Sequence, residues 1–366
     1  MAARHSSSPL KAFTLAFDHE AYNEEPLARE MAAHTGANLQ TIPIRQSDLA
    51  EHFADSIWHC EMQCINANTT AKYLLSRAAR DAGYKVVLTG EGSDEIFGGY
   101  AHFRQDMLLH NQQGQNEQSV KLLLEELKLK NKISEGLLLT ENSSIQALNS
   151  VQRLLGFVPA WMLASAEGYL SSVSLYSADF IAQVLHRDVY RVFFNQIDVH
   201  QKLKGRDPVH QSLYLWSKTI LPNYLLRMLG DGVEMAHSIE GRLPFLDHKV
   251  VELVCNMPVA LKIRGLTEKY VLRAAKPFIT DTMYNRQKHP FLAPPSTFNL
   301  HEALQQLVQD TLRSSLMASV PFYNHAAVIN LLDQLPIMSE SQRASTDVIL
   351  MKMLSTCILQ ERFKLM

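Results

Sequence analysis

The chain has 366 residues, of which 46% are hydrophobic and 20% charged, and its formal net charge is −2. This composition excludes an intrinsically disordered chain and allows one large core or two smaller ones. Acidic and basic residues are interspersed, which gives no electrostatic case for nucleic acid or an anionic membrane as a partner. No apolar run approaches the length of a membrane span, so we expect no membrane partner.

The four cysteines lack metal-ligand spacing and suit a reducing compartment, which predicts a cytoplasmic protein. Cys60 and Cys64 can share a helix face, but buried thiols are the simpler interpretation. The first ten residues contain Arg and Ser without acids, as an organelle transit peptide does. They also fit a helix end and a loop that leads into a strand, and we favour that interpretation.

The first hundred residues alternate between strand and helix patterns. Alternating apolar residues predict a strand at 11–17, and apolar residues at helical spacing predict a helix at 20–36. A second strand is expected at 39–44, a helix at 65–82 and a third strand at 85–88. This order predicts an α/β fold built on a doubly wound parallel sheet.

The stretch 86–100 combines a strand end, a tight turn and a helix start. Two glycines flank Glu91, and Ser93 stands where a helix N-cap belongs, ahead of Asp94 and Glu95. Ligands of open parallel sheets collect beyond the carboxyl ends of the strands. Three carboxylates crowd this corner, and they need a cation, a metal-phosphate complex or a substrate amine to compensate their charge. An ordinary helix cap with acids in its first turn is the alternative, which the flanking glycines disfavour.

Beyond residue 100 the pattern becomes mainly helical. A polar loop around 112–116 precedes a Leu-rich helix at 121–130, and another loop is expected at 140–144. Further helical segments are expected at 174–186, 208–229, 247–256, 267–276, 301–317 and 344–360. The two parts together suggest a nucleotide-binding α/β half wrapped by a helical half that shapes an acceptor site.

Four ordered segments resemble motifs of the asparagine synthetase family, the ATP-pyrophosphatase amide ligases. The first is Gly-Glu-Gly-Ser-Asp-Glu at 90–95, and the second is Glu-Gly-Arg-Leu-Pro-Phe-Leu-Asp at 240–247. The segment at 268–273 is similar to the family's Lys-x-x-Leu-Arg helix, and the segment at 286–291 is similar to the one that follows it. The resemblance extends from about residue 11 to beyond residue 295.

This resemblance implies an adenine nucleotide alpha hydrolase-like fold and activation of a carboxylate by ATP with Mg²⁺. The carboxylate, aspartate by default, attacks the α-phosphate and gives an acyl adenylate and pyrophosphate. Ammonia or an amine then attacks the acyl carbon, and AMP leaves. Related members close lactams or amidate secondary metabolites, so the acceptor stays open. The implied partners are a small-molecule carboxylate and ammonia or an amine.

The resemblance also implies roles for particular residues. Glu91 matches the catalytic carboxylate that holds the amine and takes its proton. Lys269 matches the catalytic lysine, whose compact charge stabilises phosphate and oxyanion charge. Asp94 matches the metal ligand that also serves the pyrophosphate. Taken alone, Lys269 near a helix start would be a solvated surface residue.

Other residues are implied to bind the nucleotide or the acceptor. Leu15, Thr89 and Gly90 align with the family's contacts to ATP. Glu95 is expected to contribute to acceptor binding. Arg242 either positions the substrate or belongs to a structural clamp between the two halves, and both interpretations stay open.

Two parts of the family pattern do not occur in these 366 residues. One is the pyrophosphate-binding loop, Ser-Gly-Gly-x-Asp-Ser. Its absence predicts weaker binding of the triphosphate and leaves only half of the carboxylates that the family uses to bind magnesium. The other is the glutaminase domain, which needs a cysteine after the initiator methionine, where this chain has Ala. We therefore expect an N-terminally truncated asparagine synthetase domain at 1–366, with a nucleotide-binding part at 1–105 and a helical acceptor-site part at 106–366.

The absence of the pyrophosphate-binding loop, with the strand that precedes it, leaves several alternatives open. Its strand lies inside the family's sheet, so its deletion should leave two strands without a partner. A separate glutaminase, a separate N-terminal chain or a homo-oligomer are open partners. A non-catalytic remnant or subunit and a nucleotide-binding regulator are alternatives to an amide ligase, but the intact Glu91, Asp94 and Lys269 favour the ligase.

Overall fold

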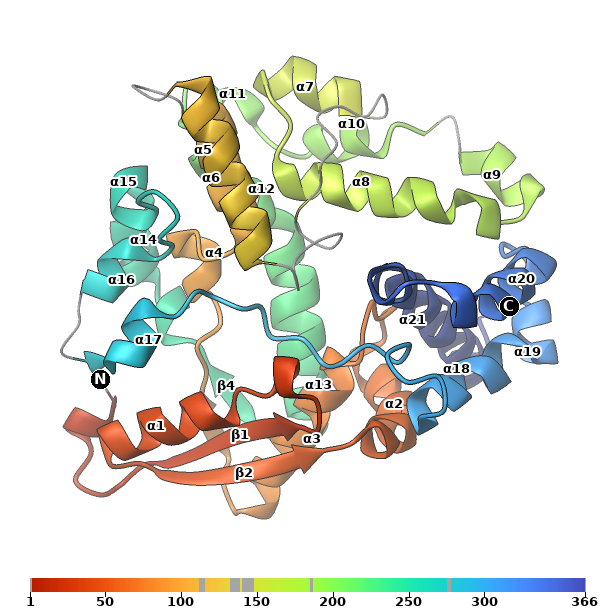
Figure 1. Cartoon of the computed structure of the whole chain (residues 1–366), viewed down its shortest axis with the longest axis horizontal. Coiled ribbons are helices and arrows are strands. Elements are labelled where there is room, and N and C mark those ends of the chain that lie inside the picture. The colour runs from red at the N-terminus through yellow and green to blue at the C-terminus, as the bar shows by residue number, and fades with distance from the viewer. Residues whose placement is uncertain are drawn as a thin grey trace.

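The computed structural model describes residues 2–111, 116–131, 139, 148–184, 187–274 and 278–365. A small α/β part carries the N-terminus, and a larger helical part surrounds it on two sides (Figure 1). The loop expected at 140–144 and most of the loop expected at 112–116 lie outside the described residues. In the part of the chain that is described, no helix is long and apolar enough to cross a membrane.

Two parallel strand pairs form the α/β part. Strand β1 (Lys11–Phe17) pairs with β2 (Asn38–Ile44), and β3 (Val86–Leu88) pairs with β4 (Glu240–Arg242). The three strands expected from the sequence are confirmed to within a residue. Strand β4 was not predicted, because the Arg-Leu-Pro-Phe segment that follows has the pattern of a turn.

The structure does not confirm the continuous doubly wound sheet that the sequence predicts. Among the described residues no strand joins β1 to β3, so each of these strands keeps one unpaired edge. Strand β3 leaves Val86 and Leu88 exposed over 38% and 58% of their surface. An apolar edge strand of this kind is a template for further pairing. The prediction of parallel strands is therefore confirmed, but these strands form two small sheets within a mainly helical molecule.

Three helices connect the strands of the α/β part: α1 (Glu25–Thr35), α2 (Gln46–Cys60) and α3 (Asn68–Asp81). Helix α1 begins later than the expected residue 20, with a proline in its first turn. Helix α2 was not predicted, although Leu49, Phe53 and Ile57 recur at helical spacing and are fully buried.

The helical part comprises α4 (Ser93–Phe97), α5 (Ala101–His110), α6 (Glu117–Lys130), α7 (Asn149–Leu155), α8 (Ala160–Ser172), α9 (Ala178–Val184), α10 (Val189–Phe194), α11 (Val199–Lys202), α12 (Pro208–Ile220), η6 (Leu221–Asp231), α13 (Gly232–Met235), α14 (His248–Cys255), α15 (Val259–Lys262), α16 (Tyr270–Ala274), α17 (Asp281–Asn285), α18 (Ala303–Leu312), α19 (Ser315–Ala318), α20 (His325–Gln334) and α21 (Glu340–Phe363). The helix expected at 208–229 is α12 continued by the π-helix η6. The segment at 301–317 divides into two helices, and α21 is longer than its expected core.

Two large hydrophobic clusters hold these elements together. One packs β1, α2 and α3 against α18 and α21, and the other packs α5 against α8 and α12. The π-helix η6 contributes Met228 to the first cluster and Leu225 and Leu229 to the second. Helix α12 and η6 therefore join the α/β part to the helical part, and they stand between the two in Figure 1. Cys60 and Cys64 are buried thiols in the first cluster, as expected.

Candidate active site

The turn after β3 brings its carboxylates beside two glycines. Gly92 is the N-cap of α4, with φ +89°, and Ser93 is the first helical residue and not the cap that the sequence predicts. The left-handed backbone at this position favours glycine. A Cβ on Gly99 would lie 1.9 Å from Oδ1 of Asp94. The Asp94 carboxylate therefore rests against the backbone at the end of α4.

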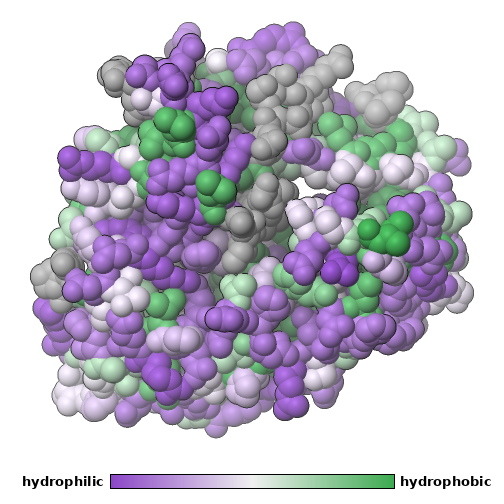
Figure 2. Space-filling model, viewed as in Figure 1, coloured by the Kyte–Doolittle hydropathy of each residue, from purple (hydrophilic) through white to green (hydrophobic). Residues whose placement is uncertain are grey.

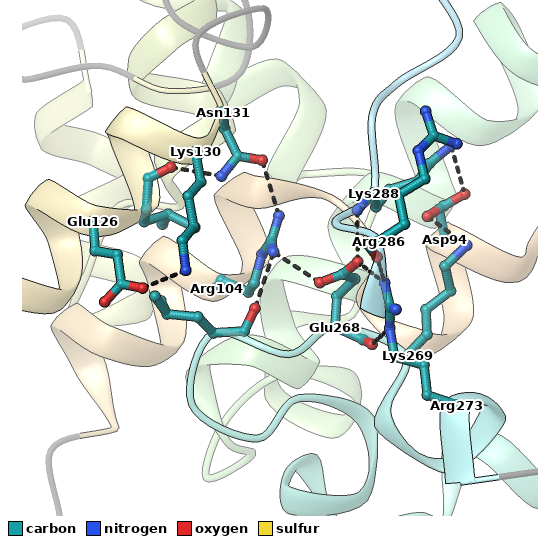
Figure 3. Close-up of polar contacts among 12 residues, drawn as sticks. Asp94, Arg104, Glu126, Lys130, Asn131, Glu268, Lys269, Arg273, Arg286 and Lys288 are labelled. Carbon is teal, nitrogen blue, oxygen red and sulfur yellow. Dashed lines mark hydrogen bonds and ion pairs between the residues drawn. The ribbon is translucent and has the colours of Figure 1, made fainter. Parts of the chain in front are cut away.

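Asp94 lies between two lysines (Figure 3). Nζ of Lys269 is 2.8 Å from Oδ1 of Asp94, and Nζ of Lys288 is 3.6 Å from Oδ2. Burial by itself raises the pKa of Asp94, but the charges of Lys288 and Lys269 outweigh it and lower that pKa. The carboxylate is therefore ionised, and the structure brings together the metal ligand and the catalytic lysine implied by the resemblance.

Glu91 has a different partner. Nζ of Lys72, on α3, is 3.1 Å from Oε1 of Glu91, and both side chains are mostly buried. Lys72 was not predicted as a site residue, because a single lysine on an amphipathic helix gives no signal of function. Its contact with Glu91 depends on how α3 packs beside the end of β3.

Glu95 is 1% exposed and accepts a hydrogen bond of 2.6 Å from the Tyr100 hydroxyl. Burial, with a further contribution from the charge of Asp94, raises the pKa of Glu95 to about 7. Two cavities lie at the end of β3, and Glu95 lines neither of them. Its expected role in acceptor binding would have to act through Tyr100, which does line the larger cavity.

Arg242 lies on β4 with 61% of its side chain exposed, and its Nε donates to Oε1 of Glu240 at 2.8 Å. The main-chain carbonyl of Arg242 accepts a hydrogen bond of 3.0 Å from the N–H of Thr89. The structure does not bring the guanidinium to either cavity. The main-chain hydrogen bond joins the two halves, and the role of the Arg242 side chain stays a prediction.

Two cavities meet at the end of β3. The smaller, of about 410 Å³, is lined by Leu15 and by aromatic residues that include Phe17 and Tyr22. The larger, of about 1290 Å³, is lined by Thr89, Gly90 and the Asp94 cluster and extends between the helices. Lys72, Glu91 and the segment 290–292 line both cavities. A ligand in one cavity can therefore reach a ligand in the other beside Glu91.

A second charge network supports the lysines (Figure 3). Arg104, which is fully buried, donates from Nη1 to Oε2 of Glu268 at 2.8 Å, and Arg273 pairs with the same carboxylate. Oε1 of Glu268 also accepts the main-chain N–H of Lys288 at 2.8 Å. Lys269 follows Glu268 with φ +48°, a conformation that costs energy in a lysine. The network therefore fixes the chain segments that carry both lysines.

The residues present fit ATP with a divalent cation. The smaller cavity offers apolar and aromatic walls to a flat base, with Arg286 at its rim. The buried Thr89 hydroxyl has no hydrogen-bond partner among the described residues. No cluster of three or more metal-ligating side chains occurs in the described part of the chain. Mg²⁺ bound to phosphates needs only one or two carboxylates, and Asp94 can provide one.

Comparisons with known proteins identify the family of this chain. The family model described as asparagine synthase matches residues 1–358. The chain is 30% identical to "Amidase chry2" of Gibberella zeae over 328 residues, which are 82% of this chain and 46% of that protein. It is 24% identical to "Asparagine synthetase [glutamine-hydrolyzing] 1" of Bacillus subtilis over 321 residues, which are 84% of this chain and 47% of that protein.

The chain spans about half the length of the curated relatives it matches, which include "Amidase chyE" of Penicillium rubens, 29% identical over 82% of this chain and 46% of that protein. The family match covers both the α/β part and nearly all of the helical part. It also covers the strand end, the two cavities and the lysines around Asp94. The chain therefore belongs to the asparagine synthase family.

Proposed function

We propose that this chain is the synthetase portion of an ATP-dependent amide ligase. It would transfer the AMP group of ATP to a substrate carboxylate and release pyrophosphate, after which ammonia or an amine displaces AMP. The observation that carries the proposal is the meeting of the two cavities at Glu91, with Asp94, Lys269 and Lys288 beside it. One cavity would hold the nucleotide and the other the acceptor, with the reacting atoms between them.

Each charged group at this junction has a chemical role in the proposal. Lys269 and Lys288 would leave Asp94 for the phosphates and stabilise the charge that develops on them. Mg²⁺, when bound at Asp94, neutralises the pyrophosphate. Glu91 would exchange Lys72 for the incoming amine and take its proton.

The acceptor and the source of nitrogen belong to the proposal as well. Aspartate is the default acceptor, and a secondary-metabolite carboxylate is the second candidate. The names of two relatives, which are amidases and not asparagine synthetases, are consistent with an acceptor other than aspartate. In the proposal the ammonia is free or comes from a glutaminase, and some relatives of this chain are named glutamine-hydrolysing. A cytoplasmic location remains a prediction, supported by the four free thiols.

The test is pyrophosphate release from ATP and Mg²⁺ with aspartate and with a panel of other carboxylic acids. Residues 1–366 are compared with the same chain extended upstream by a Ser-Gly-Gly-x-Asp-Ser unit. We expect release from the extended protein, reduced by about 100-fold or more in Glu91→Gln and Lys269→Met. The matched control is Lys249→Met, which removes an exposed lysine outside both cavities.

The outcomes separate the alternatives. Binding of ATP without pyrophosphate release for any acid would indicate a nucleotide-binding regulator. The absence of both would indicate a non-catalytic remnant. Release that is unaffected by Glu91→Gln and Lys269→Met would contradict the assigned site.

A further inference from the structure

The larger cavity is too big for a small dicarboxylic amino acid. Its volume of about 1290 Å³ exceeds the roughly 300–1000 Å³ of pockets that enclose drug-sized ligands. Its walls come from α8, from α12 with η6, and from α21. Figure 2 shows the surface hollowed between α8 and α21. The groups expected to react with aspartate make up only a small part of its lining.

Both hydrophobic cores contribute apolar side chains to the lining of the larger cavity. Trp161 and Trp216 line the cavity from the helical core, and Met228 and Ile349 line it from the other core. Three polar wall groups are hydrogen-bonded within the helical segment itself: the Ser165 hydroxyl donates to the Trp161 carbonyl at 2.8 Å, and Thr219 and Asn223 donate to carbonyls four residues back. The charged residues Lys128 and Glu167 also line the cavity. The apolar side chains favour an apolar ligand surface.

One face of α21 adds a lysine to the lining of the cavity. Ser345, Val348, Ile349 and Lys352 recur at helical spacing and all line the cavity. The Lys352 ammonium makes no hydrogen bond or ion pair with any described residue. Burial lowers the pKa of Lys352. An ammonium that has lost water without gaining a partner in the described part of the chain favours an anionic or hydrogen-bond-accepting ligand group.

We propose that the acceptor is an elongated carboxylic acid with an apolar body and a second anionic or hydrogen-bond-accepting group, which Lys352 binds. This inference rests on the proposed function, because it assigns the larger cavity to the acceptor. The reacting carboxylate lies beside Glu91 and Lys269, the apolar body lies along Trp161 and Trp216, and the remote group reaches α21. Lys352 is thus a specificity residue for the acceptor.

The test measures binding to residues 1–366 by calorimetry, which does not require turnover. The probes are aspartate, decanoate and decanedioate. The last two have the same apolar chain and differ only in the remote carboxylate, which decanedioate alone carries. We expect decanedioate to bind at least about tenfold more tightly than aspartate. Lys352→Met should weaken the binding of decanedioate to the level of decanoate and leave the binding of decanoate unchanged. Lys249→Met should change the affinity for neither acid.

A second variant tests the cavity itself. Gly168, on α8, lines the cavity and has no positive φ, and a Cβ added there would meet no heavy atom within 4 Å, so the position accepts a larger side chain. Gly168→Phe should weaken both long acids by about tenfold and leave aspartate unchanged. The matched control is Leu170→Phe, an exposed position on the same helix outside the cavity.

Tighter binding of aspartate than of both long acids, or affinities that Lys352→Met and Gly168→Phe do not change, would overturn the inference. If the extended protein releases pyrophosphate faster with aspartate than with the long acids, the proposed function is supported and this inference is contradicted. Binding of the long acids as expected, without pyrophosphate release for any acid, would support this cavity assignment and contradict the proposed function.

Discussion

Three neighbouring carboxylates meet three different environments at the end of β3. Glu91 pairs with Lys72, Asp94 pairs with Lys269 and Lys288, and Glu95 is buried beneath Tyr100. The charged partners stabilise the ionised form of Asp94, whereas burial favours the neutral form of Glu95. A run of similar side chains can therefore divide into groups with different charge near neutral pH.

The first prediction concerns the stability contributed by Glu95. Its pKa is raised from 4.5 to about 7 in the folded protein, so this contribution is complete below about pH 4.5 and is lost as the pH rises through 7. Glu95→Gln keeps an acceptor for Tyr100 and removes the ionisation. We expect the variant to gain stability relative to the wild type as the pH rises, on the order of 3 kcal/mol at pH 8.

Urea unfolding of both proteins at pH 5, 7 and 8 measures this difference. Asp106 and Asp347 also have raised pKa values, but they are present in both proteins and cancel. A difference that is the same at all three pH values would contradict the assignment to Glu95.

The second prediction concerns the buried ion network. Arg104→Met removes a fully buried guanidinium and leaves Glu268 with an incomplete set of partners. We expect a loss of about 3 kcal/mol in the free energy of unfolding, because breaking one side of a buried pair is costly. Arg80→Met, which breaks the exposed pair with Asp81, is the control and should cost less than about 1 kcal/mol. Equal losses in the two variants would mean that the network adds no stability.

At the scale of elements, the short helix α4 controls where Asp94 lies. Gly99→Ala would place a methyl group against the Asp94 carboxylate and its main chain. We expect pyrophosphate release to fall by about tenfold or more, because the carboxylate must leave Lys269 to make room. Gly230→Ala, whose added Cβ would meet only ordinary contact, is the control.

Assays of pyrophosphate release and of melting temperature separate the two possible effects of Gly99→Ala. A large fall in melting temperature without a specific loss of turnover in the folded fraction would show that the glycine serves folding alone. Retained activity in both variants would mean that the position of Asp94 is not important for the reaction.

At the scale of the whole molecule, the two small sheets leave an apolar strand edge open. Leu88 on β3 is 58% exposed, and unpaired apolar edges pair with other chains. We expect residues 1–366 to self-associate with rising concentration, and Leu88→Lys to suppress this. Leu129→Lys, at an exposed position on α6, is the control and should have little effect. Sedimentation velocity over a range of concentrations checks this, and a monomer at every concentration would contradict it.

The local features of this protein followed from the sequence. Strands at 11–17 and 85–88, the glycine turn with its carboxylates, and the family motifs could all be recognised, because alternation and turn chemistry depend on neighbouring residues. The resemblance also predicted Asp94 and Lys269 as site residues, and the structure places them in contact. Their roles remain predictions. These features carry the family membership.

Tertiary structure alone decided the remaining features. The pairing of Lys72 with Glu91, the burial of Arg104 against Glu268, and the position of Lys352 on a cavity wall join residues that are far apart in the chain. Periodicity gives no information about such contacts, because they depend on how whole helices pack. The division of the strands into two sheets is of the same kind, since strand order and edge pairing are set by long-range contacts.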